Sequence, residues 1–413
     1  IAAGPLSAST SVEDKALKLV MNVLFPKASD VADSVVASAT EELERAAFYA
    51  IENYKKISKA NEAVIAKNPA GKSYNNLSQS QSEEEKIAME RVRKPVVLFM
   101  ALCVRRPEII KTLMSISCRD RANVLLKAVR NNMPKLAKAT GTKYGTANIA
   151  HQVSDLTVEC EIPLLLAFLD NLAPSTDNNL PSQELIDACH EIQKKRLDKD
   201  EKKDARYIIP IVSGMKRVDL VSKLPEFVAA SDSIFKASLK RMSERVVRHS
   251  LMFRDEPDNE NPALNGMTLC EQVVYLHRMD FASAKLPQKR YLDAIRICLE
   301  DDEVFTDRVI MAALDHMSGT FLSGDEGLPL AYMRTIILTC SKHESLHSWI
   351  CHILLPRLIE GKVYTDRRQW EGWMRCAKML ENTGDAGVSS INAIQQLPEE
   401  QLRMYRAKYP KKN

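Results

Sequence analysis

The dipeptide Leu-Pro recurs along the chain at points where helical patterns of apolar residues begin. Proline suits the first turn of a helix, because its missing N–H would have no partner there and its fixed φ matches the helix. Two of the gaps between successive dipeptides are 44 and 42 residues, a period typical of solenoids with two helices per repeat. Solenoids present long surfaces to other macromolecules, so the pattern favours a scaffold over an enzyme. The dipeptides are Leu180-Pro181, Leu224-Pro225, Leu286-Pro287, Leu328-Pro329 and Leu397-Pro398.

Composition agrees with a helical protein. The 413 residues are 45% hydrophobic, enough for a large core, but include only 13 glycines and 6% aromatic residues. A large Rossmann enzyme or a β-sandwich would normally need more glycine for its turns and phosphate-binding loops. We therefore predict an all-α fold, a HEAT-like helical-repeat solenoid of antiparallel helix pairs.

Net charge and cysteine content exclude few classes of protein, but they bear on the partners and the cellular compartment to expect. The net charge is +4, from 58 basic and 54 acidic residues, and over the whole chain this balance does not require a nucleic-acid partner. None of the nine cysteines forms a Cys-x-x-Cys pair, which favours buried free thiols in a reducing compartment. No apolar run is long enough for a membrane span, so no membrane partner is expected. The first residue is Ile1, and we expect a piece of a longer protein.

The chain divides at two polar stretches. Residues 68–82 are rich in Asn, Ser, Gln and Gly, and residues 254–266 are rich in Asp, Asn, Glu and Pro, so both are predicted linkers. The predicted domains are 1–82, an N-terminal helical segment plus linker; 83–253, the first part of the helical repeats; and 254–413, the C-terminal part with a capping helix at 398–408.

Apolar spacing places the helices. Residues 207–212 are the best strand candidate, but their helical neighbours favour a helix bent by Pro210. The predicted helices are 12–25, 30–66, a helix opening at Glu83 and ending before Pro107, 107–116, 119–138, 147–157, 161–172, 182–197, 231–252, 267–280, 287–300, 303–317, 328–341, 345–360, 366–381, 387–395 and 398–408.

One pattern suggests metal chemistry. His343-Glu344-Ser345-Leu346-His347 matches H-E-x-x-H, in which two histidines one turn apart bind zinc and the glutamate acts as a base. Cys351 would lie on the same helix face. Against a zinc metalloenzyme using His343, Glu344 and His347, a lysine precedes the first histidine and no standard third ligand follows. The alternative is a pair of surface histidines near a helix end, and no cofactor is expected.

A second pattern suggests phosphate binding. Lys236, Arg241, Arg245 and Arg248 recur at helical spacing, with Lys240 beside them. Such a stripe could meet RNA phosphates or an acidic partner. It could equally be the solvated side of a helix whose other side is apolar. An RNA-binding helical-repeat protein is therefore the alternative to a protein-binding scaffold.

The C-terminal third resembles a known family. The relevant stretches are LPQKRYLDAIRICLEDDEVFTDRVIMAALDHM at 286–317, LPLAYMRTIILTC at 328–340, VYTDRRQWEGWMRCAKML at 363–380 and INAIQQLPEEQLRMYRAKYP at 391–410. Their most specific pieces are Trp370-Glu371-Gly372 followed by Cys376, Gln396-Leu397-Pro398, and Met333-Arg334-Thr335. These resemble the C-terminal region of the symplekin family, and 99–104 with 207–212 extend the likeness loosely to residue 85. Residues 1–82 show no clear match.

The resemblance implies a non-catalytic scaffold of pre-mRNA cleavage and polyadenylation. It would bind the C-terminal domains of the endonuclease and its inactive paralogue in the cleavage and polyadenylation specificity factor. The cleavage stimulation factor would be a further partner, and RNA contact would be indirect or weak. The expected location is the nucleus, with the cytoplasm as a second one. The family's N-terminal HEAT domain is not part of the likeness, so its phosphatase binding is not carried over.

The tryptophans and arginines near residue 370 are the candidate contacts. Trp370 and Trp373 are three residues apart and share a helix face, where they could pack the core or anchor a partner. Interface hot spots are enriched in Trp and Arg. The predicted partner-binding residues are Arg334, Arg367, Arg368, Trp370, Trp373 and Arg375.

Overall fold

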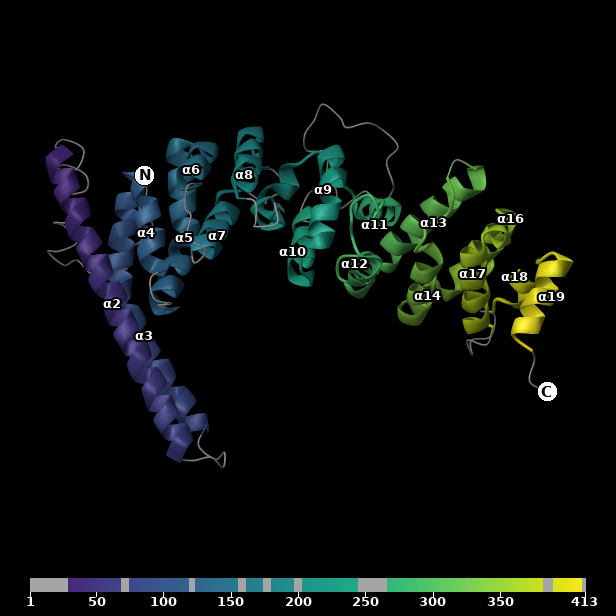
Figure 1. Cartoon of the computed structure of the whole chain (residues 1–413), viewed down its shortest axis with the longest axis horizontal. Coiled ribbons are helices and arrows are strands. Elements are labelled where there is room, and N and C mark those ends of the chain that lie inside the picture. Colours follow the sequence, from purple (N-terminus) through teal and green to yellow (C-terminus); the bar gives the residue numbers. More distant parts are fainter. Residues whose placement is uncertain are drawn as a thin grey trace. The chain divides into compact units, whose positions relative to one another are not determined.

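The computed structural model is helical throughout the residues it describes, and it confirms the predicted all-α class of packed helix pairs (Figure 1). None of the described helices is both long and apolar enough to span a membrane. The described residues are 29–67, 74–118, 123–154, 161–173, 180–196, 203–243, 266–324, 326–381 and 389–410.

The chain forms two compact units. Unit 1 comprises Ile1–Pro174 with Asp187–Ile192, and unit 2 comprises Ser175–Ile186 with Gln193–Asn413. Helix α8 (Gln183–Lys195) contributes to both. The three predicted domains, 1–82, 83–253 and 254–413, stay a prediction.

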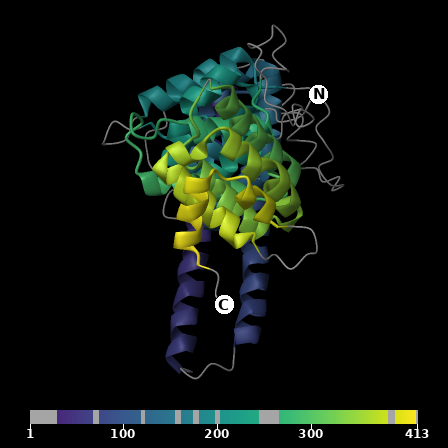
Figure 2. The same ribbon diagram turned by 90° about the vertical axis from the view of Figure 1, so that its right-hand side faces the viewer.

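The described part of unit 1 begins with two long helices that run alongside each other, α2 (Ser29–Lys67) and α3 (Tyr74–Cys103) (Figure 2). Their core includes Leu43 and Val92, both fully buried. The predicted linker over 68–82 is wrong from Tyr74 onward, because α3 already begins there. Residues 74–82 contain no glycine or proline, so their modest helix propensity does not stop a helix that the following residues support. The predicted helix 12–25 lies outside the described residues.

The rest of unit 1 packs around α5. This helix contacts α3 on one side and α7 on another. At its end the hydroxyl of Tyr144 donates to the carbonyl of Arg105 at 2.6 Å, which ties α5 to the turn after α3. Gly145 follows with φ +86°, a conformation that favours glycine, and opens the next helix. The elements are η2 (Pro107–Ile109), α4 (Ile110–Cys118), α5 (Asn123–Tyr144), α6 (Thr146–Val153) and α7 (Ile162–Leu172).

Unit 2 continues the helical succession to the C-terminus. The segment predicted as a bent helix is helical: Ile209–Gly214 form a 3₁₀ helix with Pro210 in the first turn. The predicted helix 231–252 begins as α10, and residues 244–252 lie outside the described part, as does 254–265 of the second predicted linker. The elements are η5 (Ala205–Tyr207), η6 (Ile209–Gly214), α9 (Arg217–Ala229), α10 (Asp232–Ser243), α11 (Leu269–Arg278), α12 (Gln288–Glu300), α13 (Asp307–Ser323), α14 (Tyr332–Lys342), η9 (Glu344–Leu346), α15 (His347–Trp349), η10 (Ile350–Leu354), α16 (Leu355–Glu360), η11 (Val363–Thr365), α17 (Arg367–Met379), α18 (Ile391–Gln395) and α19 (Glu399–Lys408).

Four of the five Leu-Pro dipeptides stand just before a helix, as predicted. Pro287 and Pro398 cap α12 and α19, while Pro181 and Pro329 precede α8 and α14 by a few residues. The prediction for Leu224-Pro225 is wrong, because Pro225 lies inside α9.

The start of α9 explains the exception. Arg217, its first residue, is buried, and its guanidinium bonds the carboxylate of Glu271 at 3.0 Å. Glu271 is fully buried and also accepts from the backbone N–H of Thr268 at 2.7 Å, closing a capping box at the start of α11. This buried ion pair, whose hydrogen bonds are satisfied, fixes the start of α9 at Arg217. The dipeptide Leu224-Pro225 therefore does not set where the helix begins. The 44-residue interval is therefore no structural repeat.

Candidate protein-interaction site

The Trp-containing helix α17 is fixed by its first residues and by its inner face. The carboxylate of Asp366 accepts from the backbone N–H groups of Arg368 at 2.8 Å and Gln369 at 3.1 Å, which caps the helix. Trp370 and Trp373 then stack with ring centroids 5.2 Å apart. Because capping and stacking both hold α17, the orientation of its outer face is well defined.

Both tryptophans lie in the core of unit 2. Trp373 is fully buried and its indole N–H donates to the carbonyl of Leu355 at 3.1 Å. Trp370 is 4% exposed, and Tyr364 meets its ring edge-on. In the free chain these two residues are packing residues. Their predicted contact with a partner stays a prediction.

The four predicted arginines occupy the opposite, solvent side. Arg334 on α14 and Arg367, Arg368 and Arg375 on α17 are all exposed. Helices α14 and α17 pack directly against each other, and the buried thiol of Cys340 on α14 lies 3.6 Å from that of Cys376 on α17. Arg367 is the most open, with 92% of its side chain accessible and Glu371 at 3.6 Å. The arrangement is a cationic surface over an aromatic core, and its binding role stays a prediction.

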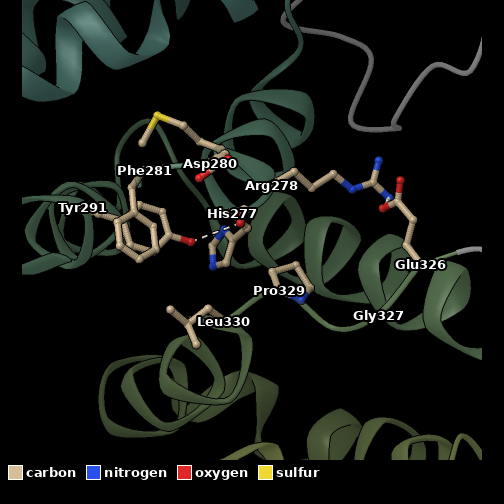
Figure 3. A pocket seen from close by; sticks show the side chains of 10 residues that line it. His277, Arg278, Asp280, Phe281, Tyr291, Glu326, Gly327, Pro329 and Leu330 are labelled. Atoms are coloured by element: carbon tan, nitrogen blue, oxygen red, sulfur yellow. Dashed lines mark hydrogen bonds and ion pairs between the residues drawn. The ribbon is translucent and has the colours of Figure 1, made fainter. Parts of the chain in front are cut away.

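Unit 2 also holds a pocket of about 430 Å³ that the sequence pattern did not reveal (Figure 3). It lies where the end of α11 meets α12 and the segment leading to α14. The rings of Phe281 and Tyr291 stack at 4.9 Å on one side. Across the pocket Arg278 reaches Glu326 at 2.9 Å. The lining residues are His277, Arg278, Met279, Asp280, Phe281, Tyr291, Glu326, Gly327, Pro329 and Leu330.

Hydrogen bonds below the pocket fix its walls. The hydroxyl of Tyr291 donates to the carbonyl of His277 at 3.0 Å. The Nδ1 atom of His277 lies 2.7 Å from the carbonyl oxygen of Val273 and must donate, so the neutral ring accepts from Thr335 at Nε2, also 2.7 Å away. Burial lowers the pKa of His277 to about 4, so its ring is neutral at physiological pH. The aromatic pair Phe281 and Tyr291 was the available signal, but it straddles a turn, where helical spacing gives no guidance.

The structure contradicts the alternative of a zinc site at His343 and His347. Helix α14 ends at Lys342, and His343 has φ −115° and ψ 75°, so His343 is not one helical turn before His347. The ring of His343 donates to Asp307 at 2.6 Å, whereas His347 donates to the carbonyl of Cys340 at 2.6 Å. Cys351 is buried. Within the described residues no three His, Cys, Asp or Glu side chains gather as a metal site.

The side-chain contacts of His343 and Ser345 show that this turn has a structural role. Asp307 accepts from the hydroxyl of Ser345 and from His343, and these bonds, the Ser345 bond foremost, lower the pKa of Asp307. The side chains therefore join the start of α13 to the turn after α14. The zinc motif is a structural corner.

Comparison with known families identifies the larger part of unit 2. Residues 204–409 match the family model described as "Symplekin tight junction protein C terminal". Residues 204–409 belong to the symplekin family. The match runs from η5 to α19 and so contains the pocket, the arginine surface and the tryptophan core. No solved structure matches the chain.

The symplekin match confirms the predicted resemblance where it was most specific. Its region is a scaffold domain of a generally non-catalytic family. Residues 85–203, where the likeness was loose, lie outside the match.

The predicted basic stripe begins inside the symplekin domain. Lys236 is exposed on α10, whereas the guanidinium of Arg241 donates to the carbonyl of Pro210 at 3.3 Å and so helps to hold η6. Arg245 and Arg248 lie outside the described residues. Phosphate binding by this stripe stays a prediction.

Proposed function

We propose that the chain is a non-catalytic scaffold of pre-mRNA 3′-end cleavage and polyadenylation. The observation that carries the proposal is the symplekin C-terminal match over residues 204–409. The partners are the C-terminal domains of the endonuclease and of its inactive paralogue in the cleavage and polyadenylation specificity factor. The cleavage stimulation factor is a further partner, and the place of action is the nucleus.

We further propose that the partner domains meet the arginine surface of α14 and α17. Its support is physical: three of the four exposed guanidinium groups stand on α17, whose inner face is locked by stacked tryptophans, and the fourth stands on α14, which packs against α17. A preorganised surface loses less entropy on binding than a mobile one. Arginine can hold a carboxylate through two parallel hydrogen bonds, so the matching surface of the partner carries Asp or Glu.

The test is a binding titration between the purified chain and the co-purified C-terminal domains of the endonuclease pair. Reversing Arg367 and Arg368 to Glu should weaken binding by at least tenfold, because opposite charges become like charges. The matched control reverses Arg403 and Arg406 on α19, which are also exposed and change the net charge by the same amount. No binding by the unaltered chain would refute the partner assignment; equal losses in both variants would refute the surface.

Conservative variants separate geometry from charge. Arg367→Lys with Arg368→Lys keeps the charge but removes the planar fork of the guanidinium. If the arginines bind carboxylates through paired hydrogen bonds, this variant should recover only part of the affinity that the Glu variant loses. Full recovery would indicate long-range attraction alone.

A further inference from the structure

Helix α5 of unit 1 concentrates positive charge that the chain as a whole conceals. Its 22 residues include five lysines and arginines and no aspartate or glutamate. The surrounding segment 86–154 contains fourteen basic and three acidic residues, a net charge of +11, whereas the whole chain carries +4. This segment lies outside the symplekin match.

Four of the cations on α5 form one stripe. At about 100° per residue, Lys127, Arg130, Lys135 and Lys138 fall within about 140° of the helix circumference and span about 16 Å along its axis. All four are exposed. The opposite side of α5 is buried against α3 and α7, and this packing holds the stripe on the solvent side of the helix. The buried residues of that side are Leu125, Val129, Met133, Leu136, Ala137 and Thr140.

Two acidic residues on elements next to α5 are engaged by arginines outside it. Glu90 on α3 lies 3.8 Å from Arg93, and Glu108 lies 2.7 Å from Arg106. Both carboxylates are therefore already paired with arginines outside α5. Helix α5 itself has no acidic residue, so its own side chains contribute only positive charge to this face.

The side chains that lie between and beside these cations favour a nucleic-acid partner over a protein partner. Asn131 within the stripe and Thr142 one turn beyond it are exposed and polar, and both can bond phosphate or sugar oxygens. No large apolar side chain of α5 is exposed, whereas protein interfaces centre on buried apolar or aromatic anchors. Tyr144 is turned toward the carbonyls of Val104 and Arg105 and is not available as a stacking platform for bases.

We propose that the outer face of α5 binds the phosphate backbone of RNA without reading its sequence. The stripe supplies the cations, and the neighbouring amide and hydroxyl groups supply neutral hydrogen bonds. Contact through phosphates alone predicts tolerance of any base sequence and strong dependence on salt. The site is separate from the arginine surface of α14 and α17, so either assignment can fail without the other.

The test is fluorescence anisotropy of a labelled oligouridine of about 20 nucleotides titrated with the full chain. Four phosphate contacts to a single strand give a slope of log affinity against log salt of about −2.8, or about a 50-fold loss between 50 and 200 mM salt. Arg130→Gln with Lys138→Gln should reduce the slope to about −1.4 and weaken binding about 25-fold at 0.1 M salt. Glutamine keeps a helix propensity close to that of Lys and Arg, so α5 should remain folded.

The matched control is Lys285→Gln with Lys289→Gln, two exposed lysines of unit 2 that change the net charge equally. It should bind RNA like the unaltered chain, and circular dichroism should show the same helix content for both variants. A single-stranded DNA of the same length should bind through the same contacts. The proposal fails if the α5 variant keeps its affinity and slope, or if the control loses as much. It also fails if polyglutamate binds the face as tightly as a polynucleotide of equal charge, which would assign an acidic protein instead.

Discussion

Gly372 of α17 lies so close to Met333 of α14 that a Cβ atom on it would stand 2.5 Å from the Cβ of Met333. Carbon atoms do not approach that closely, so the two helices depend on glycine for their separation. The same two helices bring the thiols of Cys340 and Cys376 to 3.6 Å. Close packing here sets the distance between the arginine on α14 and those on α17.

Gly372→Ala should lower the free energy of unfolding by about 1–3 kcal/mol, because α14 and α17 must move apart. Urea denaturation measures the change. The control is Gly319→Ala in α13, where a Cβ would meet nothing within 4 Å. That variant should stabilise the chain by up to about 1 kcal/mol, since alanine loses less backbone entropy in a helix. Opposite signs are expected, and two equal losses would show that the crowding at Met333 is not decisive.

Trp373→Ala should destabilise unit 2 by about 3–5 kcal/mol, since it removes a fully buried ring and leaves a cavity. Arg368→Ala on the outer face of the same helix should change the free energy of unfolding by less than about 0.5 kcal/mol. Chemical denaturation followed by circular dichroism compares the two. A Trp373 variant as stable as the chain with Arg368→Ala would contradict the inward placement of the indole.

His277 should make stability depend on pH. Its folded pKa of about 4 is below the ordinary value of 6.5, so the unfolded chain binds the proton first as pH falls. The stabilisation is complete above about pH 6.5 and is lost as pH falls toward about 4, a change on the order of 3 kcal/mol. Urea unfolding over this range measures it. His277→Gln should flatten the profile, and a profile of unchanged slope in that variant would assign the dependence elsewhere.

The buried thiols should resist modification. Burial raises the pKa of Cys351 to about 11, and the contact with Cys340 followed by burial raises the pKa of Cys376, so little thiolate forms near neutral pH. The half-exposed Cys118 should react with iodoacetamide well before them. Peptide mass spectrometry after timed labelling gives the order. Labelling of Cys376 at the rate of Cys118 in the folded chain would show that α14 and α17 open readily.

Helical periodicity predicted most of the fold, because the apolar spacing of a helix is carried by many residues and does not depend on any single one. The errors came from residues whose local signal was overruled by neighbours. Pro225 signalled a helix start, but the buried pair of Arg217 and Glu271 sets the start eight residues earlier. His343 and His347 fit a helical metal motif, but the chain leaves the helix at Lys342.

The candidate sites were less predictable than the helices. Arg334 and Arg367 could be named from composition and family likeness, because helical spacing indicates which arginines lie on the exposed face of a helix. The charge of α5 was hidden because a net charge of +4 averages over the whole chain. A sliding count of charge over helix-sized windows would have found it. The pocket beside Phe281 depends on a turn and a helix start meeting in space, which no periodicity encodes.

The bond between Arg217 and Glu271 has a further consequence for a severed chain. It joins the start of α9 to the start of α11, and the guanidinium of Arg290 on α12 donates to the carbonyl of Ala230 at 2.6 Å after α9. Helices α9 and α10 also pack on α12. A protease nick anywhere between Ser243 and Gly266 should therefore leave two fragments that co-purify, and separately expressed halves should reassemble when mixed.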